Sequence, residues 1–428
     1  MEIVGLFLLI LFMLLGMPVA FALLTAGAIG LFLIDIDSGF SVLTTTPYRA
    51  VANFTLSTIP LFILMAEFLS RSGFAKDLYD SSNKWVGHFP GGLGISSILT
   101  CALMGTMSGS TTATAAAMSR IAIPEMDRHG YNRIMSTGII AFGGTIAGLI
   151  PPSIGLIIYG IQTETSIGKL LIAGIIPGVL LTLLLSLGIY LRAKTNPAWA
   201  PVGFSFSWKE KIYSLKYLWA VIIILLVVIG SIYSGFATAT ESAALGAGAS
   251  ALLGFLTKRL SLKDFYESLI STIRTTTMIF SIIIGAMVFG YYLTITGMAL
   301  SFITFLTTMD VPNIGILILV LFVYLILGFF MDAIAILLLT LPLTFPVIIE
   351  LGYDPIWFGI LVIMMVEIGL VTPPLGVNAF VVSSISKEPI NNVFRGSVYM
   401  VLIALITLTI IVIFPNLVTW LPSTIKGI

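Results

Sequence analysis

The sequence is poor in charge, in cysteine and in histidine, and each shortage excludes a class of protein. Only 9% of its 428 residues are charged, whereas soluble domains carry about 25%. The net charge of +1 comes from 20 basic and 19 acidic residues in short loops, which leaves no basic face for nucleic acid. The single cysteine, Cys101, excludes an internal disulfide and a cysteine-based metal cluster. The two histidines, His88 and His129, lie far apart in loop-like sequence, which argues against a histidine metal site.

The sequence also lacks the motifs that catalysis would need. No nucleophile, base and orienting group stand in a recognisable arrangement. No glycine-rich loop ends in Gly-Lys followed by Ser or Thr, as a phosphate-binding loop would. We therefore expect neither an enzyme nor an ATPase.

Apolar residues are what the sequence has in excess. They make up 58% of the chain, and long runs recur from one end to the other, as at residues 3–15, 170–191 and 217–232. A helix needs about 20 apolar residues to cross a bilayer, and fewer where it is broken or re-entrant. An outer-membrane barrel would instead show short segments of alternating apolar and polar residues, and none is visible. The composition predicts an all-α polytopic protein embedded in a lipid bilayer.

Two Pro-Pro signatures reveal an internal repeat. Gly-Leu-Ile-Pro-Pro-Ser-Ile-Gly occupies residues 148–155, and Gly-Leu-Val-Thr-Pro-Pro-Leu-Gly occupies residues 369–376, 221 positions further on. Pro124 followed by Gly130-Tyr131 recurs 222 positions later as Pro346 followed by Gly352-Tyr353. Likewise, Ala22 and Gly27 recur 221 positions later as Ala243 and Gly248. Three matches at offsets of 221 or 222 indicate that the two halves are copies of one plan.

Each copy reads in the same order. Two hydrophobic segments come first, then a third, then an interrupted apolar stretch, a broken Pro-Pro helix and a closing span. We therefore divide the chain into a first repeat, a cytoplasmic linker and a second repeat, at residues 1–192, 193–216 and 217–428. The broken helices are expected at about 134–165 and 356–386. The plan gives about ten transmembrane helices.

The interrupted stretches are interpreted as two re-entrant helical hairpins, at about residues 92–122 and 313–349. They are broken at Gly-Thr-Met-Ser-Gly-Ser-Thr-Thr (105–112) and at Gly-Phe-Phe-Met-Asp-Ala (328–333). Each arm has roughly 12–15 residues, which at about 1.5 Å per residue reaches only about 20 Å. The hydrocarbon core is about 30 Å thick. Both tips are therefore expected near the middle of the membrane.

Charge around the two hairpins predicts opposite orientations for the two repeats. The first hairpin is flanked by basic residues: Arg71, Lys76, Lys84, Arg120, Arg128 and Arg133. The second is flanked by Asp310, Glu350 and Asp354, with no Lys or Arg nearby. By the positive-inside rule the ends of the first are cytoplasmic, and those of the second are periplasmic. Five crossings per repeat, an odd number, make the repeats inverted. Both termini are then expected in the periplasm of a bacterial inner membrane.

The breaks themselves point to a buried polar site. Irregular backbone in hydrocarbon is tolerated only where protein or a water-filled cavity supplies partners. Carbonyls freed by proline can coordinate Na⁺, and the N-termini of half-helices favour an anion. Broken helices in inverted repeats are the best sequence pointer to a transporter binding site.

Pairing each hairpin tip with the break of its own repeat gives two candidate sodium sites. The first combines the hydroxyl of Ser108, Ser110 or Thr111 with backbone carbonyls of residues 148–152. These carbonyls belong to Gly148, Ile150 and Pro152, among others. The second combines carbonyls near Gly328 and Gly369 with Thr372 and Asp332. A substrate between the two tips would meet the following polar side chains: Ser110, Thr111, Thr112, Asp332 and Asn378.

Structural explanations compete with these assignments. A Gly/Ser/Thr cluster in one membrane helix is more often a packing face than a ligand site. Because both repeats contain an interrupted hairpin, a ligand site is favoured for the tip as a whole. The repeat does not favour this role for any single hydroxyl. Glu67 and Glu241 lie near segment ends and are expected at the interface. Glu367 is deeper, and it is either a functional acid or a helix-packing partner.

The residues also resemble a known family. Gly-Met-Pro-Val-Ala-Phe-Ala (16–22), Ile-Pro-Leu-Phe-Ile-Leu-Met-Ala-Glu-Phe (59–68), Ser-Gly-Ser-Thr-Thr-Ala-Thr-Ala (108–115) and both Pro-Pro breaks resemble the large membrane subunit of the tripartite ATP-independent periplasmic (TRAP) transporters. The similarity runs along the full length of the chain. It implies an elevator-type importer of organic acids, such as C4-dicarboxylates or sialic acid, driven by Na⁺. It also implies two partners, a periplasmic substrate-binding protein and a separate small four-helix membrane subunit.

Carried over by position, the family's sodium ligands fall on the first tip with residues 148–152, and on Gly328, Gly369 and Thr372. The second tip has few hydroxyls, so the resemblance implies ligation there by the backbone. The main rival is a stand-alone sodium/dicarboxylate symporter of the same plan. Such carriers usually have Ser-Asn-Thr at both tips, and Met331-Asp332-Ala333 does not match. A passive channel or scaffold would leave the two interrupted hairpins unexplained.

Overall fold

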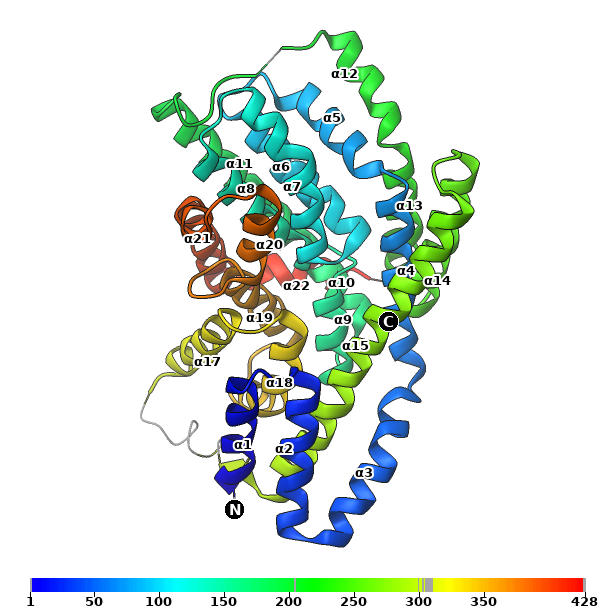
Figure 1. Ribbon diagram of the computed structural model, residues 1–428, viewed down its shortest axis with the longest axis vertical. Helices are drawn as coiled ribbons and strands as arrows, with labels where there is room; N and C mark the ends of the chain where they lie inside the picture. Colours follow the sequence, from blue (N-terminus) through cyan, green and yellow to red (C-terminus); the bar gives the residue numbers. More distant parts are fainter. Residues whose placement is uncertain (1, 204, 299, 302–303, 305–310, 426–428) are drawn as a thin grey trace.

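The computed structural model describes residues 2–203, 205–298, 300–301, 304 and 311–425. Throughout these ranges the regular elements are helices, and none is a strand (Figure 1). This confirms the all-α prediction. Asp310, which entered the charge argument, lies outside the described residues.

Seven helices form what we call the arm group. In it α2 packs against α15, and α4 packs against both α14 and α15. Figure 1 shows α1, α2 and α3 at one end of the long axis, with α15 running from them toward the other end. The members are α1 (Glu2–Leu14), α2 (Val19–Ile34), α3 (Ile36–Val51), α4 (Thr58–Arg71), α13 (Trp219–Tyr233), α14 (Ala239–Leu256) and α15 (Leu262–Ile295).

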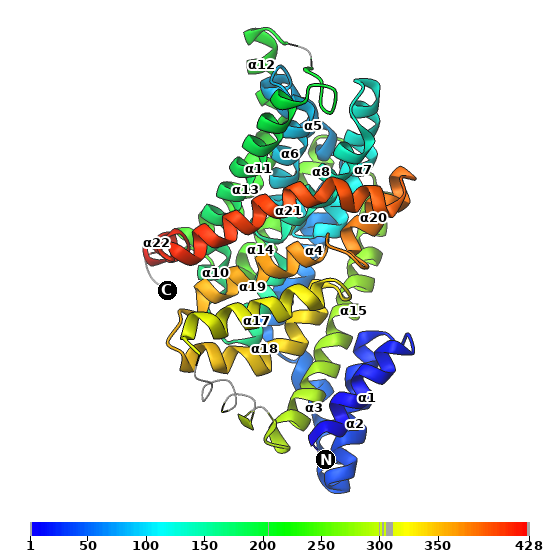
Figure 2. The same ribbon diagram turned by 90° about the vertical axis from the view of Figure 1, so that its left-hand side faces the viewer.

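A second set of helices contains both interrupted stretches and both Pro-Pro breaks, and we call it the hairpin group. Helices from the two halves of the chain interleave in it, since α8 packs against α21 and α7 packs against α20 (Figure 2). The members are α6 (Gly92–Ser108), α7 (Thr111–Arg128), α8 (Arg133–Thr145), α9 (Ile154–Gln162), α10 (Ile167–Ala173), α11 (Ile175–Thr195), α17 (Asn313–Gly328), α18 (Ala333–Glu350), α19 (Pro355–Gly369), α20 (Val377–Ser386), α21 (Ile390–Ile413) and α22 (Asn416–Ser423).

Each interrupted stretch forms a pair of packed helices, and each Pro-Pro segment separates two helices. Arms α6 and α7 pack together, as do α17 and α18. The hydroxyls of Tyr324 and Thr344 join the second pair, 2.7 Å apart. After α8 the chain makes one 3₁₀ turn, η2 (Ile146–Gly148), and becomes helical again at Ile154. Helix α19 likewise ends at Gly369, and α20 begins at Val377. The peptide bonds Pro151-Pro152 and Pro373-Pro374 are both cis.

The hairpin arms are longer than the roughly 12–15 residues that the sequence suggested. Helices α6 and α7 have 17 and 18 residues, and α17 and α18 have 16 and 18. The arms extend to the polar residues that cap their ends, such as Ser110 on α7 and Asp332 on α18. The re-entrant course of the hairpins stays a prediction.

By length and composition, six helices among the described residues can each cross a membrane, or seven if the bent pair of α12 (Trp208–Ser214) and α13 counts as one span. Several other apolar helices have 10–17 residues. The chain is thus a multi-pass membrane protein. The number of about ten crossings and the inversion of the repeats remain predictions.

Two helices depart from the expected segments. Helix α15 has 34 residues, so the third hydrophobic segment of the second repeat is part of a much longer continuous helix. Helix α3 was not expected, because its residues include many polar side chains and no long apolar run. Despite these polar side chains, α3 packs against α2 and α15, and the side of α3 that contains Gly39, Thr46 and Ala50 is buried.

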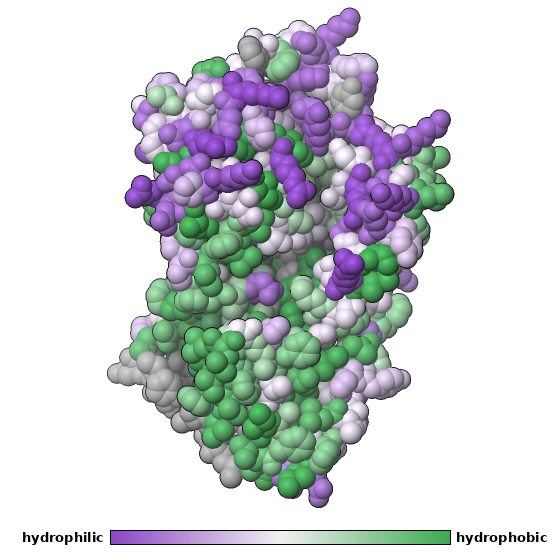
Figure 3. Space-filling model, in the orientation of Figure 1, coloured by the Kyte–Doolittle hydropathy of each residue, from purple (hydrophilic) through white to green (hydrophobic). Residues whose placement is uncertain are grey.

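Hydrophilic side chains gather at one end of the molecule. On the face shown in Figure 3 they cover the end that carries α5 (Phe74–Val86) and α12, whereas the opposite end is largely apolar. Ion pairs join elements at this hydrophilic end, such as Arg133 with Asp127 at 3.1 Å. The polar end and the apolar remainder agree with a protein that meets water at this end and lipid beside it.

Candidate functional site

The first hairpin tip lies directly against the first Pro-Pro break. Gly109 has a left-handed backbone (φ +55°), and a Cβ on it would collide with the carbonyl oxygen of Pro152. The Ile154 N–H donates to the Gly109 carbonyl over 3.5 Å. Nearby, the Ser108 and Thr114 hydroxyls lie 2.8 Å apart. The first tip and the first Pro-Pro break are therefore in direct contact.

The polar groups of the first break are partly satisfied within the break itself. The Ser153 hydroxyl donates to the Gly148 carbonyl and accepts from the N–H of Leu156 at 3.2 Å, so it also caps α9. A carbonyl oxygen has two lone pairs, so that of Gly148 keeps one for a further partner.

The second tip meets the second break in a comparable way. The Gly376 N–H donates to the Phe329 carbonyl over 3.3 Å. Gly328 and Gly369 touch through their backbones, since a Cβ on Gly369 would lie 2.6 Å from the Gly328 Cα. The Thr372 hydroxyl donates to the carbonyl of Ile368, one turn earlier, at 2.7 Å. The contact is therefore made by backbone, and few hydroxyls take part.

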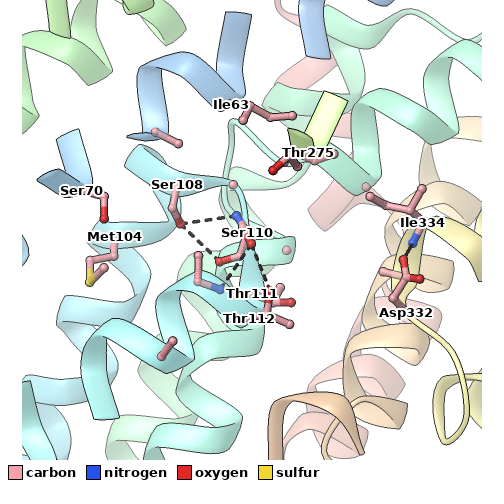
Figure 4. A pocket seen from close by; sticks show the side chains of 18 of the residues that line it. Ile63, Ser70, Met104, Ser108, Ser110, Thr111, Thr112, Thr275, Asp332 and Ile334 are labelled. Atoms are coloured by element: carbon pink, nitrogen blue, oxygen red, sulfur yellow. Dashed lines mark hydrogen bonds between the residues drawn. The ribbon is translucent and has the colours of Figure 1, made fainter. Parts of the chain in front are cut away.

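Both tips line one cavity of about 630 Å³. Figure 4 shows the first tip, with Ser108, Ser110, Thr111 and Thr112, on one side and Asp332 with Ile334 on the other. The arm group completes the wall with residues of α4 and α15, among them Ile63 and Thr275. The cavity therefore lies between the two helix groups.

Not every predicted residue reaches this cavity. Its wall includes six of them: Ser108, Ser110, Thr111, Thr112, Gly148 and Asp332. Pro152 faces the tip through its carbonyl, whereas Ile150 lines a separate apolar groove. Gly328, Gly369, Thr372 and Asn378 do not line the cavity. Asn378 is fully buried on α20, and its side-chain amide has no hydrogen-bond partner among the described residues.

Two residues at the tips have a structural role that the sequence analysis did not assign. The Ser110 hydroxyl accepts from the N–H of Ala113 at 3.3 Å, and the Asp332 carboxylate accepts from those of Ile334 and Ala335 at 3.0 and 3.3 Å. Each therefore caps the second arm of its hairpin. Capping fixes where α7 and α18 begin, and their first residues, Thr111 and Ala333, line the cavity.

The arm group also contributes polar residues to the wall, and none of these was among the predicted site residues. Glu67, expected at the interface, lines the cavity together with Ser70 and Thr275. Its carboxylate accepts from the Ser271 hydroxyl at 2.7 Å and pairs with Arg71 at 3.4 Å. The spacing of Glu67 and Ser70 places them on one face of α4, a signal that could have identified this wall.

Glu367 lies where the two halves of the chain meet. A Cβ on Gly148 would collide with its Oε1, so the acid from the second break rests against the first. It also lines the cavity. The described residues contain no group of three or more His, Cys, Asp or Glu that could hold a metal ion. The donors at the first break are hydroxyls, carbonyls and one carboxylate, which are oxygen ligands suited to Na⁺.

Comparison with known proteins identifies relatives along nearly the whole chain. Residues 6–417 match the model of the family described as tripartite ATP-independent periplasmic transporter, DctM component. A C4-dicarboxylate TRAP transporter large permease protein, DctM, from Pseudomonas aeruginosa is 39% identical over 401 residues, which cover 93% of each chain. A sialic acid TRAP transporter large permease protein, SiaM, from Vibrio cholerae is 30% identical and covers 96% of each.

A solved structure resembles the fold at low sequence identity. The YdaH transporter of Alcanivorax borkumensis superimposes with a TM-score of 0.65 over 96% of this chain and 99% of that one, at 14% identity. At this identity the likeness concerns the fold alone.

Proposed function

Because this chain belongs to the DctM component family of tripartite ATP-independent periplasmic transporters, we propose that it imports an organic acid anion together with Na⁺. The anion is of the C4-dicarboxylate or sialic acid type, the substrates named for two relatives. The chain is the large permease, and it works with a small four-helix membrane subunit and a periplasmic substrate-binding protein. It lies in the bacterial inner membrane with both termini in the periplasm.

The observation that carries this proposal is the cavity between the two tips. The N-termini of α7 and α18 both open onto it, at Thr111 and Ala333. A helix N-terminus carries about half a positive charge and has unpaired N–H groups, so two of them favour a bound anion. Hydroxyls of Ser110, Thr111 and Thr112 add hydrogen-bond donors on one side. An acid anion would bind there without a basic side chain.

Each tip and break would also hold one sodium ion. When bound, Na⁺ would supply a positive charge that attracts the anion, and it would bind the free oxygen atoms of the tips. Ser108 or Thr111 with carbonyls of the first break would form one site. The Gly328 and Gly369 carbonyls with Thr372 would form the other, where Asp332 closes the cavity side. Because ions and anion share the tips, binding of one favours binding of the other.

We further interpret the hairpin group as the moving part of an elevator built from inverted repeats. It contains both tips and both breaks, so the complete site would travel as one body. The arm group contributes only one wall, through α4 and α15. Sliding of the hairpin group along that wall would expose the cavity first to one side of the membrane and then to the other.

Uptake by the reconstituted transporter tests the proposal. Proteoliposomes that contain this chain and its small subunit should accumulate labelled acid only when the binding protein and an inward Na⁺ gradient are both present. Replacing Na⁺ by choline should abolish uptake. Transport without the binding protein would instead support a stand-alone symporter.

Two substitutions test the sodium sites. Ser108→Ala and Thr372→Ala should each raise the Na⁺ concentration needed for half-maximal uptake, by about tenfold. Ser186→Ala is the matched control, since its hydroxyl donates to a carbonyl one turn earlier on α11, outside the cavity. Unchanged sodium dependence in both site variants would contradict the assignment.

A further inference from the structure

Glu367 is an acidic side chain buried without a partner. Every residue of α19 from Trp357 to Gly369 is buried, and Glu367 is only 6% exposed. Its Oε2 has no hydrogen-bond partner, and the carboxylate forms no ion pair among the described residues. A lone carboxylate in such surroundings costs several kcal/mol. The acid must therefore be either neutral or balanced by a cation that binds beside it.

The other acids of the same cavity already have partners. Three acids line it: Glu67, Asp332 and Glu367. Glu67 is held by Arg71 and Ser271, and Asp332 accepts two backbone N–H groups as the cap of α18. Glu367 is thus the acid of this cavity for which the described residues provide neither an ion pair nor a hydrogen bond to Oε2.

The surroundings of Glu367 include oxygen donors and a small void. Its Oε1 rests against the Gly148 backbone, whose carbonyl keeps a free lone pair. On another side Glu367 borders a void of about 10 Å³ that Thr145 also lines. This approaches the volume that one water molecule needs. The Thr145 hydroxyl donates to the Phe142 carbonyl at 2.6 Å, so its oxygen can still accept or coordinate.

We propose that the Glu367 carboxylate is the anionic ligand of a monovalent-cation site at the first Pro-Pro break. The second half of the chain then supplies the charge, and the first half supplies a neutral oxygen donor on either side of the carboxylate, Gly148 on one side and Thr145 on the other. That the ion is Na⁺ rests on the proposed function. The need for glycine at 148 follows, because any Cβ there would displace the carboxylate from the break.

Thermal unfolding of the purified full-length chain, with its small subunit where the two copurify, tests the site without transport. The unfolding temperature is measured while NaCl replaces choline chloride at constant ionic strength. Glu367→Gln keeps the shape and removes the charge. We expect it to raise the Na⁺ concentration for half-maximal stabilisation about tenfold or more. In choline alone it should unfold at a higher temperature than the wild type, because the unbalanced charge is gone.

Glu67→Gln is the matched control. It removes a carboxylate from the wall of the same cavity, but one with protein partners, so the Na⁺ midpoint should stay within about twofold of the wild type. If Glu367→Gln also keeps the wild-type midpoint, the acid is neutral and the proposal is overturned. If Glu367→Gln does not fold, Glu367→Asp takes its place: retraction of the charge should weaken the response, and a wild-type response overturns the proposal.

The same titration separates this inference from the proposed function. A wild type that is stabilised by Li⁺ or K⁺ and not by Na⁺ would contradict sodium coupling. Loss of that response in Glu367→Gln would still support the cation site. A wild type that responds to no monovalent cation would contradict both.

Discussion

The two hairpin tips perform the same architectural task with different chemistry. The first tip is rich in hydroxyls, and Ser108, Thr114 and Ser110 form a connected set around Gly109. The second tip reads Phe329, Phe330 and Met331, and it meets its break through the backbones of Gly328 and Gly369. Yet each tip exchanges a backbone hydrogen bond with its own break.

This difference teaches that backbone geometry is what the two halves share. The caps Ser110 and Asp332 differ in charge and occupy matching places, 222 positions apart, at the start of the second arm. The side chains around this backbone differ: the first tip has hydroxyls, and the second tip has mainly apolar side chains. We therefore expect side chains to have different roles at the two tips. The following substitutions measure this difference as changes in the free energy of unfolding and in uptake.

The largest effect on stability is expected at the glycine contact of the second tip. Gly369→Ala places a Cβ 2.6 Å from the Gly328 Cα and 2.9 Å from the Leu325 carbonyl oxygen, both of which are backbone. We expect a loss of about 1–3 kcal/mol, typical of overpacking, in the free energy of unfolding in detergent. At the first tip Gly105→Ala should cost less, since its nearest atom, the Ala147 Cα, is 2.9 Å away.

Gly290→Ala on α15 is the control for this pair, because no atom lies within 4 Å of its added Cβ. Alanine there should be neutral or stabilising by up to about 1 kcal/mol, owing to its helix propensity. Equal stability of Gly369→Ala and Gly290→Ala would show that the second contact is looser than described.

An intermediate effect is expected from Ser153, which only the first break possesses. Ser153→Ala removes the hydrogen bond to the Gly148 carbonyl and the cap of α9, so unfolding should become easier by about 1–2 kcal/mol. The position 222 residues later is Leu375, which is 47% exposed. Leu375→Ala should change the same free energy by less than about 0.5 kcal/mol. Similar costs at both positions would remove the distinction between the breaks.

The smallest effect on stability is expected when one cap replaces the other. Asp332→Ser gives the second tip the cap of the first and should keep stability within about 0.5 kcal/mol, whereas Asp332→Ala should cost about 1 kcal/mol. Uptake then separates capping from binding. If Asp332 also serves the site, Asp332→Ser should lower uptake about tenfold, the loss of roughly 1.4 kcal/mol of contact energy. Wild-type uptake would mean that Asp332 is a cap alone.

Much of the architecture could be predicted because the physical causes are local in the chain. Apolar runs identify membrane helices, and each Pro-Pro pair follows the end of a helix, after Thr145 and after Gly369. Single prolines such as Pro124 and Pro342 lie instead within the continuous helices α7 and α18. Helix α3 was missed because its polar composition gives no such signal. The continuous α15 was underestimated because its polar first turns hid the length of the helix.

The sequence by itself determined the class of protein, and it predicted the two-copy plan and the pairing of each tip with its own break. These follow from periodicity, proline and repeat spacing, which act within one segment or recur at one offset. Only the tertiary structure decided which side chains share a cavity. It brought Glu67 and Thr275 to the wall and left Asn378 and Thr372 away from it. It also set Glu367 against Gly148, because contacts between helices depend on how they cross, and no local pattern encodes that crossing.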